Sequence, residues 1–461
     1  MLRKKSPSNS TKLKRVVSPR RRTELGLLIL AAVVTISAYI LASLGKTASM
    51  PANVLPFFGI ILTLELAAHI ANRYLAPNAD PILLPMAALL NGLGYVMITR
   101  LDYHLASKQA VWTALGIVVY ILTLLIVRYS GFLSKYRYLL ALSGIVLLIL
   151  PLAPGIGSNI NGARLWIVLG PITFQPVEVA KIALAIFFAS YLVEKQELLR
   201  VPTARLGNFL FPSPRALAPV LAAWGLSMII MVAEHDIGFS LLIFVLFISM
   251  LWVATGRVAY LIIAAVLFAI GMVIGMALFA HVVERISIWL NPWPHQNTTG
   301  YQLIQGLFAL AAGGLSGTGL GLGHPQLIPV VVSDFIFAAI GEEMGLLGTS
   351  AIVICFVLIV GAGFKIALKA RSEFPKLLAV GLTATIGFQA FFIMAGIVRL
   401  LPLTGVTLPF VAYGGSSLLA NYVLIALLMR ISAEANDSPA ITSQSYSSEI
   451  TPAWSKTSTS I

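Results

Sequence analysis

The sequence has very little charge for its length. Of its 461 residues, 10% are Asp, Glu, Lys or Arg and 58% are hydrophobic, whereas soluble domains carry about 25% charged residues. A water-soluble protein of this size needs more charged side chains to cover its surface. The composition therefore excludes a soluble enzyme, a disordered chain and a collagen-like fibre, and it indicates a polytopic membrane protein.

Several catalytic and metal-binding patterns are also missing. The single cysteine, Cys355, lies in an apolar run, which excludes a disulfide framework or a thiol metal site within one chain. The six histidines show no metal-ligand spacing, and there is no G-x-S-x-G elbow. The glycine run 313–323 contains no Gly-Lys-Ser/Thr. We interpret that run as backbone that permits tight turns and close approach to a ligand or helix.

Long apolar runs are what the sequence has in abundance. A run of about 20 apolar residues crosses a bilayer as a helix, whereas a transmembrane barrel would show short alternating strands. We therefore predict an all-α polytopic helical bundle with about 12 transmembrane helices and a large extracytoplasmic loop. The predicted spans are 24–44, 53–73, 81–99, 108–128, 137–153, 177–194, 215–233, 237–254, 257–280, 344–366, 375–398 and 415–432.

The distribution of Lys and Arg predicts which side of the membrane each loop faces. Nine cations precede residue 23, and 24 of the 31 Lys and Arg residues lie on the side that carries both termini. Because cytoplasmic loops are enriched in Lys and Arg, we expect both termini in the cytoplasm and a multi-pass protein of the cytoplasmic membrane. The basic tail is expected to contact anionic membrane lipid and not nucleic acid.

Composition also divides the chain into regions. We predict a basic cytoplasmic tail over 1–23, additional N-terminal transmembrane helices over 24–79, a core over 80–432 and a disordered cytoplasmic tail over 433–461. The long extracytoplasmic connection is predicted over 281–343. Its tryptophans, glycines and few charges favour a folded segment that lies along the membrane over a solvated linker.

Polar residues gather at the extracytoplasmic ends of several spans. Glu178 and Lys181 are three residues apart on one helix face, and they are either a self-satisfied ion pair or groups that face a cavity. Asp334 lies where the outer loop ends and a helix begins, so it is either a helix N-cap or a carboxylate that faces the loop. These positions predict one extracytoplasmic site.

Three other features extend this pattern. Arg164 lies in a polar segment just before Glu178, and prolines and glycines break the helix over 399–417. Irregular backbone at membrane depth is tolerated only against protein or a wet cavity. Glu65 and His69 are four residues apart within one span, so we predict that they form a structural pair.

Seven ordered blocks of the sequence resemble the SEDS family of cell-wall polymerases, which includes RodA, FtsW and the sporulation paralogue. The blocks are N-G-A-R-L-W-I, Q-P-V-E-V-A-K, E-H-D-I-G, G-Y-Q-L-I-Q, A-A-G-G-L-S-G-T-G-L-G, S-D-F-I-F-A-A-I-G-E-E-M-G and P-L-T-G-V-T-L-P-F-V-A-Y-G-G-S-S. They cover residues 80–432. The spans over 24–79 are an addition to this core and make the chain similar to RodA-type members with an extended front end.

The resemblance implies polymerisation of lipid II, the polyprenyl-diphosphate disaccharide-pentapeptide, on the outer face of the membrane, for cell elongation or division. Asp334 matches the family's essential Asp, and Glu178 and Lys181 match its Q-P-x-E-x-x-K block. It also implies a class B penicillin-binding protein transpeptidase and other elongation or division complex proteins as partners. Val177 and Ala412 stand where the family usually has Ser, so no role is carried over to those two side chains.

The chemistry of that reaction assigns roles to these residues. A diphosphate leaves as a stable anion, so one base, Asp334, suffices for proton removal, and the resemblance implies inversion at the sugar carbon. Positive charge is needed at the diphosphate, from arginines, Lys181 or a bound divalent cation such as Mg²⁺ or Mn²⁺. For Arg164 and Arg285, interfacial snorkelling is the alternative. The candidate substrate-binding residues are Arg164, Glu178, Lys181, Arg285, Gln302, Arg399 and Ser416.

Two other functions remain alternatives to the glycosyltransferase. A flippase or transporter of the same polyprenyl-diphosphate precursor would place its ionisable groups and broken helices near the midplane of the membrane. A non-catalytic scaffold that recruits a transpeptidase would not need Asp334. The clustering of polar segments at one face favours the enzyme.

Overall fold

The computed structural model describes residues 19–49, 54–160, 163–170, 172–200, 202–206, 209–212, 214–234 and 236–437. Residues 1–18 of the predicted basic tail and residues 438–461 of the predicted C-terminal tail lie outside the described residues. The described chain is almost entirely helical, as predicted.

Every predicted span coincides with a helix. The α-helices are α1 (Pro19–Thr47), α2 (Val54–Leu75), α3 (Leu83–Leu101), α4 (Tyr103–Ile126), α5 (Arg137–Ile149), α6 (Val177–Glu194), α7 (Gln196–Arg200), α8 (Pro214–Glu234), α9 (Ile237–Thr255), α10 (Val258–Leu278), α11 (Ala280–Leu290), α12 (Tyr301–Gly313), α13 (Ile336–Lys369), α14 (Glu373–Ile397) and α15 (Gly415–Asn436). Nine helical segments of the described chain are long and apolar enough to cross a membrane. A polytopic helical membrane protein is therefore confirmed.

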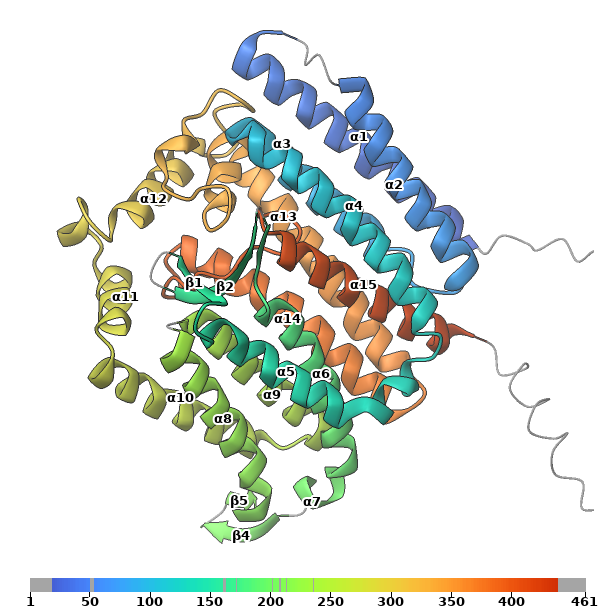
Figure 1. Cartoon of the computed structure of the whole chain (residues 1–461), viewed down its shortest axis with the longest axis vertical. Helices are drawn as coiled ribbons and strands as arrows, with labels where there is room; N and C mark the ends of the chain where they lie inside the picture. Colours follow the sequence, from blue (N-terminus) through green and yellow to red (C-terminus); the bar gives the residue numbers. More distant parts are fainter. Residues whose placement is uncertain are drawn as a thin grey trace, which may run out of the picture.

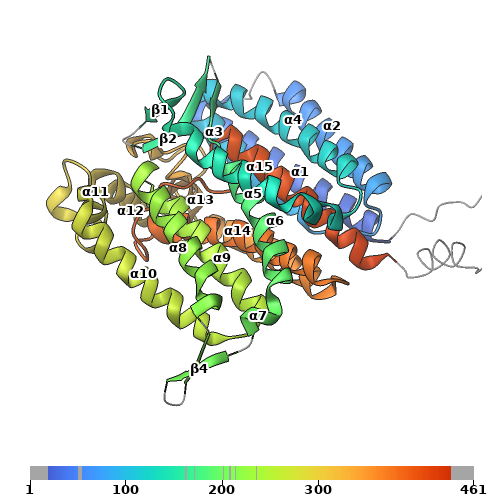
Figure 2. The same ribbon diagram turned by 60° about the horizontal axis from the view of Figure 1, so that its bottom comes forward.

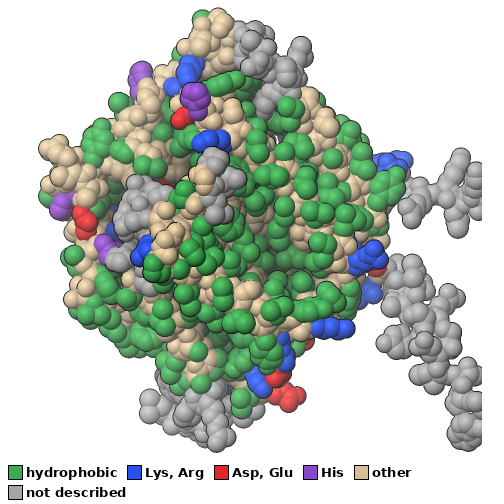
Figure 3. Space-filling model, in the orientation of Figure 1, with side chains coloured by type: hydrophobic (Ala, Val, Ile, Leu, Met, Phe, Trp, Pro, Cys, Tyr) green, Lys and Arg blue, Asp and Glu red, His purple; other side chains and the backbone are tan. Residues whose placement is uncertain are grey.

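The helices run roughly parallel and antiparallel in one bundle (Figure 1). Helix α14 is almost wholly buried and packs on α6, α9 and α13, while α15 packs on α4. The extra helices α1 and α2 lie at one side of the bundle, and α10 lies at the opposite side (Figures 1 and 2). Hydrophobic side chains cover the middle of the face in Figure 3, with charged side chains towards its edges, as a surface surrounded by lipid requires.

The two described chain ends lie at the same end of the bundle, which we call the terminal end. Arg20 donates a hydrogen bond of 2.7 Å to the backbone oxygen of Asn78, and the Asn78 side chain donates one of 2.7 Å to Asp437. The opposite end, which we call the loop end, carries the segment between α10 and α13. The described ends of the chain, Pro19 and Asp437, thus lie on one side of the bundle.

The segment between α10 and α13 is folded, as expected, and contains α11, α12 and two 3-10 turns, Trp293–His295 and Pro325–Leu327. Helix α13 begins eight residues before the predicted span. Its backbone is interrupted at Gly345, where φ is +64° and ψ is −161°, a conformation that glycine adopts without a side-chain clash. A short helix therefore precedes the predicted span, and Asp334 lies just before that short helix.

Two small antiparallel sheets, which the sequence analysis did not predict, interrupt the helical pattern. At the loop end, β1 (Gly157–Ile160), β2 (Ala163–Leu169) and β3 (Ile172–Phe174) pair in that order, with Ser158 opposite Trp166 and Ile167 opposite Phe174. At the terminal end, β4 (Pro202–Leu206) pairs with β5 (Phe209–Pro212). In β2, buried Leu165 and Ile167 alternate with more exposed neighbours, which is the two-residue period of a β-strand.

A buried polar cluster ties α1 and α2 to the core, and it corrects one prediction. His69 does not pair with Glu65: its Nδ1 lies 2.8 Å from Glu24 of α1. Asn72 also donates to Glu24, at 3.2 Å, and accepts a hydrogen bond of 2.6 Å from the Tyr120 hydroxyl of α4. The i, i+4 spacing placed Glu65 and His69 on one face, but a neighbouring helix supplied a carboxylate for His69.

The glycine run 313–323 makes the close approaches that the sequence analysis expected. A Cβ on Gly321 would collide with the backbone of α1 at Ala42, and one on Gly45 would collide with the carbonyl of Leu320. Glu343 fixes the same run, because its carboxylate accepts a 2.9 Å hydrogen bond from Gly321 N and forms an ion pair of 3.0 Å with Arg100. The end of α1 at the loop end of the bundle is therefore packed backbone to backbone against the run.

We predict that Gly45→Ala destabilises the protein by about 1–3 kcal/mol, because the added methyl group overpacks a contact between two backbones. Gly26→Ala on the same helix is the matched control, since a Cβ there meets no atom within 4 Å. Thermal unfolding of the purified protein in detergent micelles measures both variants. Equal melting temperatures for the two would contradict the packing described for α1.

Candidate functional site

A cavity of about 550 Å³ opens at the loop end of the bundle. Three residues proposed from the sequence line it together: Asp334, Arg285 of α11 and Gln302 of α12. The irregular segment between α14 and α15 contributes Leu403 and Gly405. The cavity therefore joins two of the polar segments that the sequence analysis placed on one face, the outer loop and the Pro/Gly-rich segment.

Asp334 sits in a tight turn and not in a helix cap. Its backbone N–H donates to the carbonyl of Val330 at 3.2 Å, and Val330 itself has a φ of +53°. The residue that caps α13 is Phe335, and no side chain makes a capping hydrogen bond there. The Asp334 carboxylate is therefore not used to cap the helix and lines the cavity instead. This favours the functional interpretation of Asp334 over its interpretation as an N-cap.

The surroundings of Asp334 hold its pKa near neutrality. Burial raises the pKa of the carboxyl group to about 6. A hydrogen bond from Ser333 and the positive charge of Arg285 lower it, and the negative charge of Asp236 raises it. A carboxylate with a pKa close to the working pH is suited to accept a proton in a reaction.

Arg285 is held over the cavity by a backbone contact. Its Nη1 donates a hydrogen bond of 2.7 Å to the carbonyl of Leu403. Within the described residues, the other N–H donors of this guanidinium have no hydrogen-bonded protein acceptor. A guanidinium presents five donors in a planar fork that suits phosphate oxygens, so Arg285 combines a fixed position with free donors.

Gln302 supports the turn that carries Asp334. Its Nε2 donates a hydrogen bond of 2.8 Å to the carbonyl of Pro329, and Tyr413 N donates one of 2.9 Å to the carbonyl of Val332. The turn is therefore fixed from α12 on one side and from the segment before α15 on the other. Gln302 acts on the geometry of the site as well as lining it.

Glu178 and Lys181 form a fully buried ion pair. The Lys181 ammonium also donates to Gln389 Oε1 at 2.6 Å, and Gln389 Nε2 donates to the carbonyl of Thr407 at 2.9 Å. Gln389 lies one helical turn from Ile393, which lines the cavity. The pair therefore does not line the cavity, and it supports the irregular segment that does.

Asp236 is a charged residue at the site that the sequence analysis did not propose. It caps α9: one carboxylate oxygen accepts hydrogen bonds from Gly238 N at 2.7 Å and Phe239 N at 3.4 Å. Burial raises its pKa to about 6, although the charge of Arg285 and the backbone hydrogen bonds lower it. An Asp directly before an apolar run is a recognisable N-cap signal, but its proximity to Arg285 depends on the tertiary fold.

Arg399 uses its guanidinium to hold α11. It donates to the carbonyls of Trp289 and Leu290, each at 2.9 Å, and the Trp289 indole donates back to the Arg399 carbonyl at 3.2 Å. The Arg399 backbone has a φ of +62°, which is uncommon for a residue with a side chain. The residue is thus locked in an unfavourable conformation that joins the end of α14 to the helix carrying Arg285.

Two other residues proposed from the sequence lie away from the cavity. Arg164 is half-buried in β2, and Ser416 is buried in the first turn of α15. The neighbouring hydroxyl, that of Ser417, accepts hydrogen bonds from Thr407 at 3.0 Å and Asn421 at 3.3 Å. Neither Arg164 nor Ser416 lines the cavity with Asp334.

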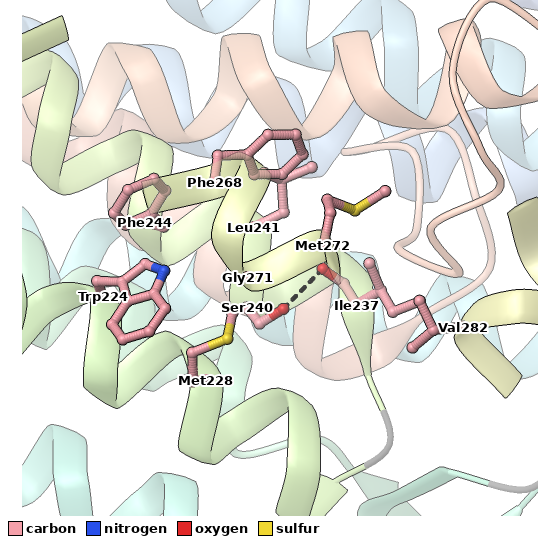
Figure 4. A pocket seen from close by; sticks show the side chains of 10 residues that line it. All are labelled: Trp224, Met228, Ile237, Ser240, Leu241, Phe244, Phe268, Gly271, Met272 and Val282. Atoms are coloured by element: carbon pink, nitrogen blue, oxygen red, sulfur yellow. Dashed lines mark hydrogen bonds between the residues drawn. The ribbon is translucent and has the colours of Figure 1, made fainter. Parts of the chain in front are cut away.

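An apolar hollow lies next to the cavity, between α8, α9, α10 and α11 (Figure 4). Its wall includes Trp224, Phe244, Phe268 and Val282, and Val282 belongs to the same helix as Arg285. The Ser240 hydroxyl in this wall donates to the carbonyl of Ile237 at 2.9 Å, so its polarity is satisfied internally. The hollow therefore presents an apolar surface beside a polar cavity.

In the part of the chain that the structure describes, no three His, Cys, Asp or Glu side chains come together in a way that would hold a metal ion. Mg²⁺ is often bound through one or two carboxylates together with substrate phosphates, so a divalent cation that accompanies the diphosphate stays a prediction.

Comparisons with known proteins agree on a family. The FtsW, RodA and SpoVE family model, described as cell cycle protein, matches residues 82–437. The chain is 42% identical over 424 residues to the peptidoglycan glycosyltransferase RodA of Mycobacterium tuberculosis, with 90% of each chain covered.

Two solved structures are similar in fold. One is a chain of a peptidoglycan synthase complex that coordinates polymerization and crosslinking, with a TM-score of 0.61 and 25% identity over 78% of this chain and 99% of that one. The other is the rod shape determining protein RodA of Thermus thermophilus, with a TM-score of 0.53 and 26% identity over 78% of this chain and 98% of that one.

We predict that Lys181→Met destabilises the protein by about 3–5 kcal/mol, because it leaves the Glu178 carboxylate buried without a counter-charge. The double variant Glu178→Leu/Lys181→Met should recover most of that loss, since no uncompensated charge remains. Lys369→Met, at an exposed position at the end of α13, is the control. Detergent-solubilised protein unfolded by heat gives the comparison, and a single variant as stable as the control would refute the structural role.

Proposed function

Because this chain belongs to the FtsW, RodA and SpoVE family, we propose that it is a peptidoglycan glycosyltransferase that polymerises lipid II into glycan strands. One observation carries the proposal: a carboxylate of near-neutral pKa, Asp334, and an anchored guanidinium with free donors, Arg285, line the same cavity. The pair supplies the proton acceptor and the positive charge that this reaction needs.

In the proposed reaction, Asp334 accepts the proton of a sugar 4-hydroxyl as its oxygen forms a bond to the anomeric carbon of a second sugar. The bond from that carbon to the diphosphate breaks at the same time, and its electron pair leaves on the diphosphate. Attack opposite the leaving group inverts the carbon. Because the diphosphate is already a stable anion, no second carboxyl group is needed to protonate it.

Arg285 stabilises the departing diphosphate, because its fixed guanidinium faces the cavity and its planar donors match phosphate oxygens. Gln302 keeps the Asp334 turn in place and contacts the sugar moieties. Glu178 and Lys181 act through Gln389 on the irregular segment beside the cavity. Arg399 acts through α11, and we assign no direct substrate contact to Arg164 or Ser416.

The apolar chain of the substrate needs a place beside the polar cavity. The hollow between α8, α9, α10 and α11 adjoins that cavity through α11. At about 40 Å³ it is small, so α10 must move aside to admit the first isoprene units. Few α10 side chains are buried against the bundle, which keeps the energetic cost of that movement low.

We further propose that both termini face the cytoplasm and that the loop end faces outwards, since the cations concentrate at the terminal end. The likeness to a chain of a synthase complex that coordinates polymerization and crosslinking supports a class B penicillin-binding protein transpeptidase as the partner. The similarity to RodA proteins supports a role in cell elongation.

Asp334→Asn should lower the rate of glycan synthesis by about 10²–10⁴-fold, the usual contribution of a positioned base, without changing thermal stability. Glu284→Gln, a carboxylate change in the same cavity, is the matched control and should keep most of the activity. The assay uses full-length protein with its transpeptidase partner in liposomes and follows glycan length on gels. Normal synthesis by the Asp334 variant, or lipid translocation without any polymer, would reject the proposed function.

The pH dependence of the rate should report the ionisation of Asp334. The base is active only when ionised, so the rate should fall as pH drops through about 6 and reach a plateau above it. Arg285→Gln removes a positive charge that lowers this pKa, so the acid limb should move to higher pH in that variant. Rates at lipid II concentrations well below saturation, which report the pKa of the free enzyme, measure the shift on both sides of pH 6, and an unmoved or downward-moved limb would argue against the assignment.

A further inference from the structure

A second hollow, separate from the reaction cavity, lies between the N-terminal helices and the core. Helix α1 packs closely along α3, where a Cβ on Gly92 would collide with Thr35. Helix α2 packs on α1 and α4, so a space of about 50 Å³ remains between α2, α3, α4 and α15. Its wall is mostly apolar and includes Leu64, Ala88 and Ile117.

Five polar side chains also line this hollow, and three of them are satisfied by one another. Asn91 donates to the Thr113 hydroxyl at 3.2 Å and to the Tyr422 hydroxyl at 3.4 Å. The other two are Tyr95 of α3 and Glu65 of α2. Among the described residues, Glu65 has no hydrogen-bond or ion-pair partner, and no Lys, Arg or His lines the hollow.

The position of Glu65 makes this lack of a partner significant. Glu65 lies near the middle of α2, eleven residues from its start, where a charged side chain is costly and usually marks a functional site. The histidine four residues along the helix is engaged with Glu24 of α1. The protein therefore brings a carboxyl group to a space inside the membrane region and provides no counter-charge there.

We propose that this hollow binds a small, membrane-permeant apolar amine. The neutral amine takes up the proton of the unpaired Glu65 carboxyl group, so that an ammonium–carboxylate ion pair forms, and the hydrocarbon part contacts the apolar wall. An anion or an alcohol cannot form this ion pair. The space holds only a few water-sized groups, which selects a short linear alkylamine over a longer chain or a ring system.

The test uses a membrane-soluble carbodiimide, which reacts with protonated carboxyl groups. Glu65 is only partly buried, so the reagent reaches it from the lipid side and need not enter the hollow. The carboxyl oxygen adds to the carbodiimide carbon, the proton moves to nitrogen, and rearrangement leaves a stable acylurea.

Full-length protein in lipid nanodiscs is treated with dicyclohexylcarbodiimide, and peptide mass spectrometry locates the adducts. We expect labelling at Glu65 and no label at this position in Glu65→Gln. Labelling should be slowed several-fold by n-butylamine, because the bound ammonium keeps the Glu65 carboxylate ionised.

Two variants of α4 separate binding in the hollow from general membrane effects. Ala110 lines the hollow, whereas the side chain of Val111 is exposed on the lipid-facing surface. Ala110→Phe fills the space and should abolish protection by n-butylamine, while Val111→Phe should keep it. Both variants must retain the unfolding temperature of the parent protein, and Ala110→Val replaces Ala110→Phe if the larger side chain lowers it.

The outcomes that overturn the proposal are distinct. No adduct at Glu65 in the absence of amine would mean that the carboxyl group is already ionised or inaccessible. Equal protection by n-butanol and n-butylamine would mean that the hollow recognises only the hydrocarbon chain. Protection that persists in the pocket-filling variant would place the amine elsewhere in the membrane.

Discussion

Non-helical backbone beside a membrane needs hydrogen-bond partners from the protein itself, and the loop end of this bundle depends on meeting that need. Long polar side chains from helices reach carbonyl groups of the irregular segments. Arg285 reaches Leu403, Gln389 reaches Thr407, and Gln302 reaches Pro329. Each contact fixes a segment that lines the cavity, so the shape of the site follows from the satisfaction of buried carbonyl groups.

This constraint explains why several cations at the loop end are not free to bind an anion. Arg399 donates hydrogen bonds to two carbonyl groups of α11. Arg100 forms an ion pair with Glu343 and donates a hydrogen bond to the carbonyl of Gly323. Lys181 is held by Glu178 and Gln389. Arg285 alone among these combines a backbone anchor with a place in the cavity wall, which is why the proposed diphosphate contact rests on it.

The sequence was sufficient to predict the membrane spans, because a bilayer requires long apolar runs and these can be recognised directly in the sequence. It was also sufficient to predict that Asp334, Arg285 and Gln302 lie on one face of the protein. It could not predict which partner each polar side chain contacts, since partners such as Glu24 for His69 come from another helix. The sheet at β2 was missed because its alternation covers only seven residues, too short to stand out among spans.

The two carboxyl groups near Arg285 give the proposed reaction an electrostatic order. Arg285 lowers the pKa of both Asp334 and Asp236, and the charge of Asp236 raises the pKa of Asp334. A bound diphosphate adds negative charge beside the same guanidinium and so raises the pKa of Asp334 further. A higher pKa makes an ionised carboxylate a stronger proton acceptor. In the proposed reaction, binding of the donor substrate therefore strengthens the base that activates the acceptor, beyond the rise in pKa that burial alone gives Asp334.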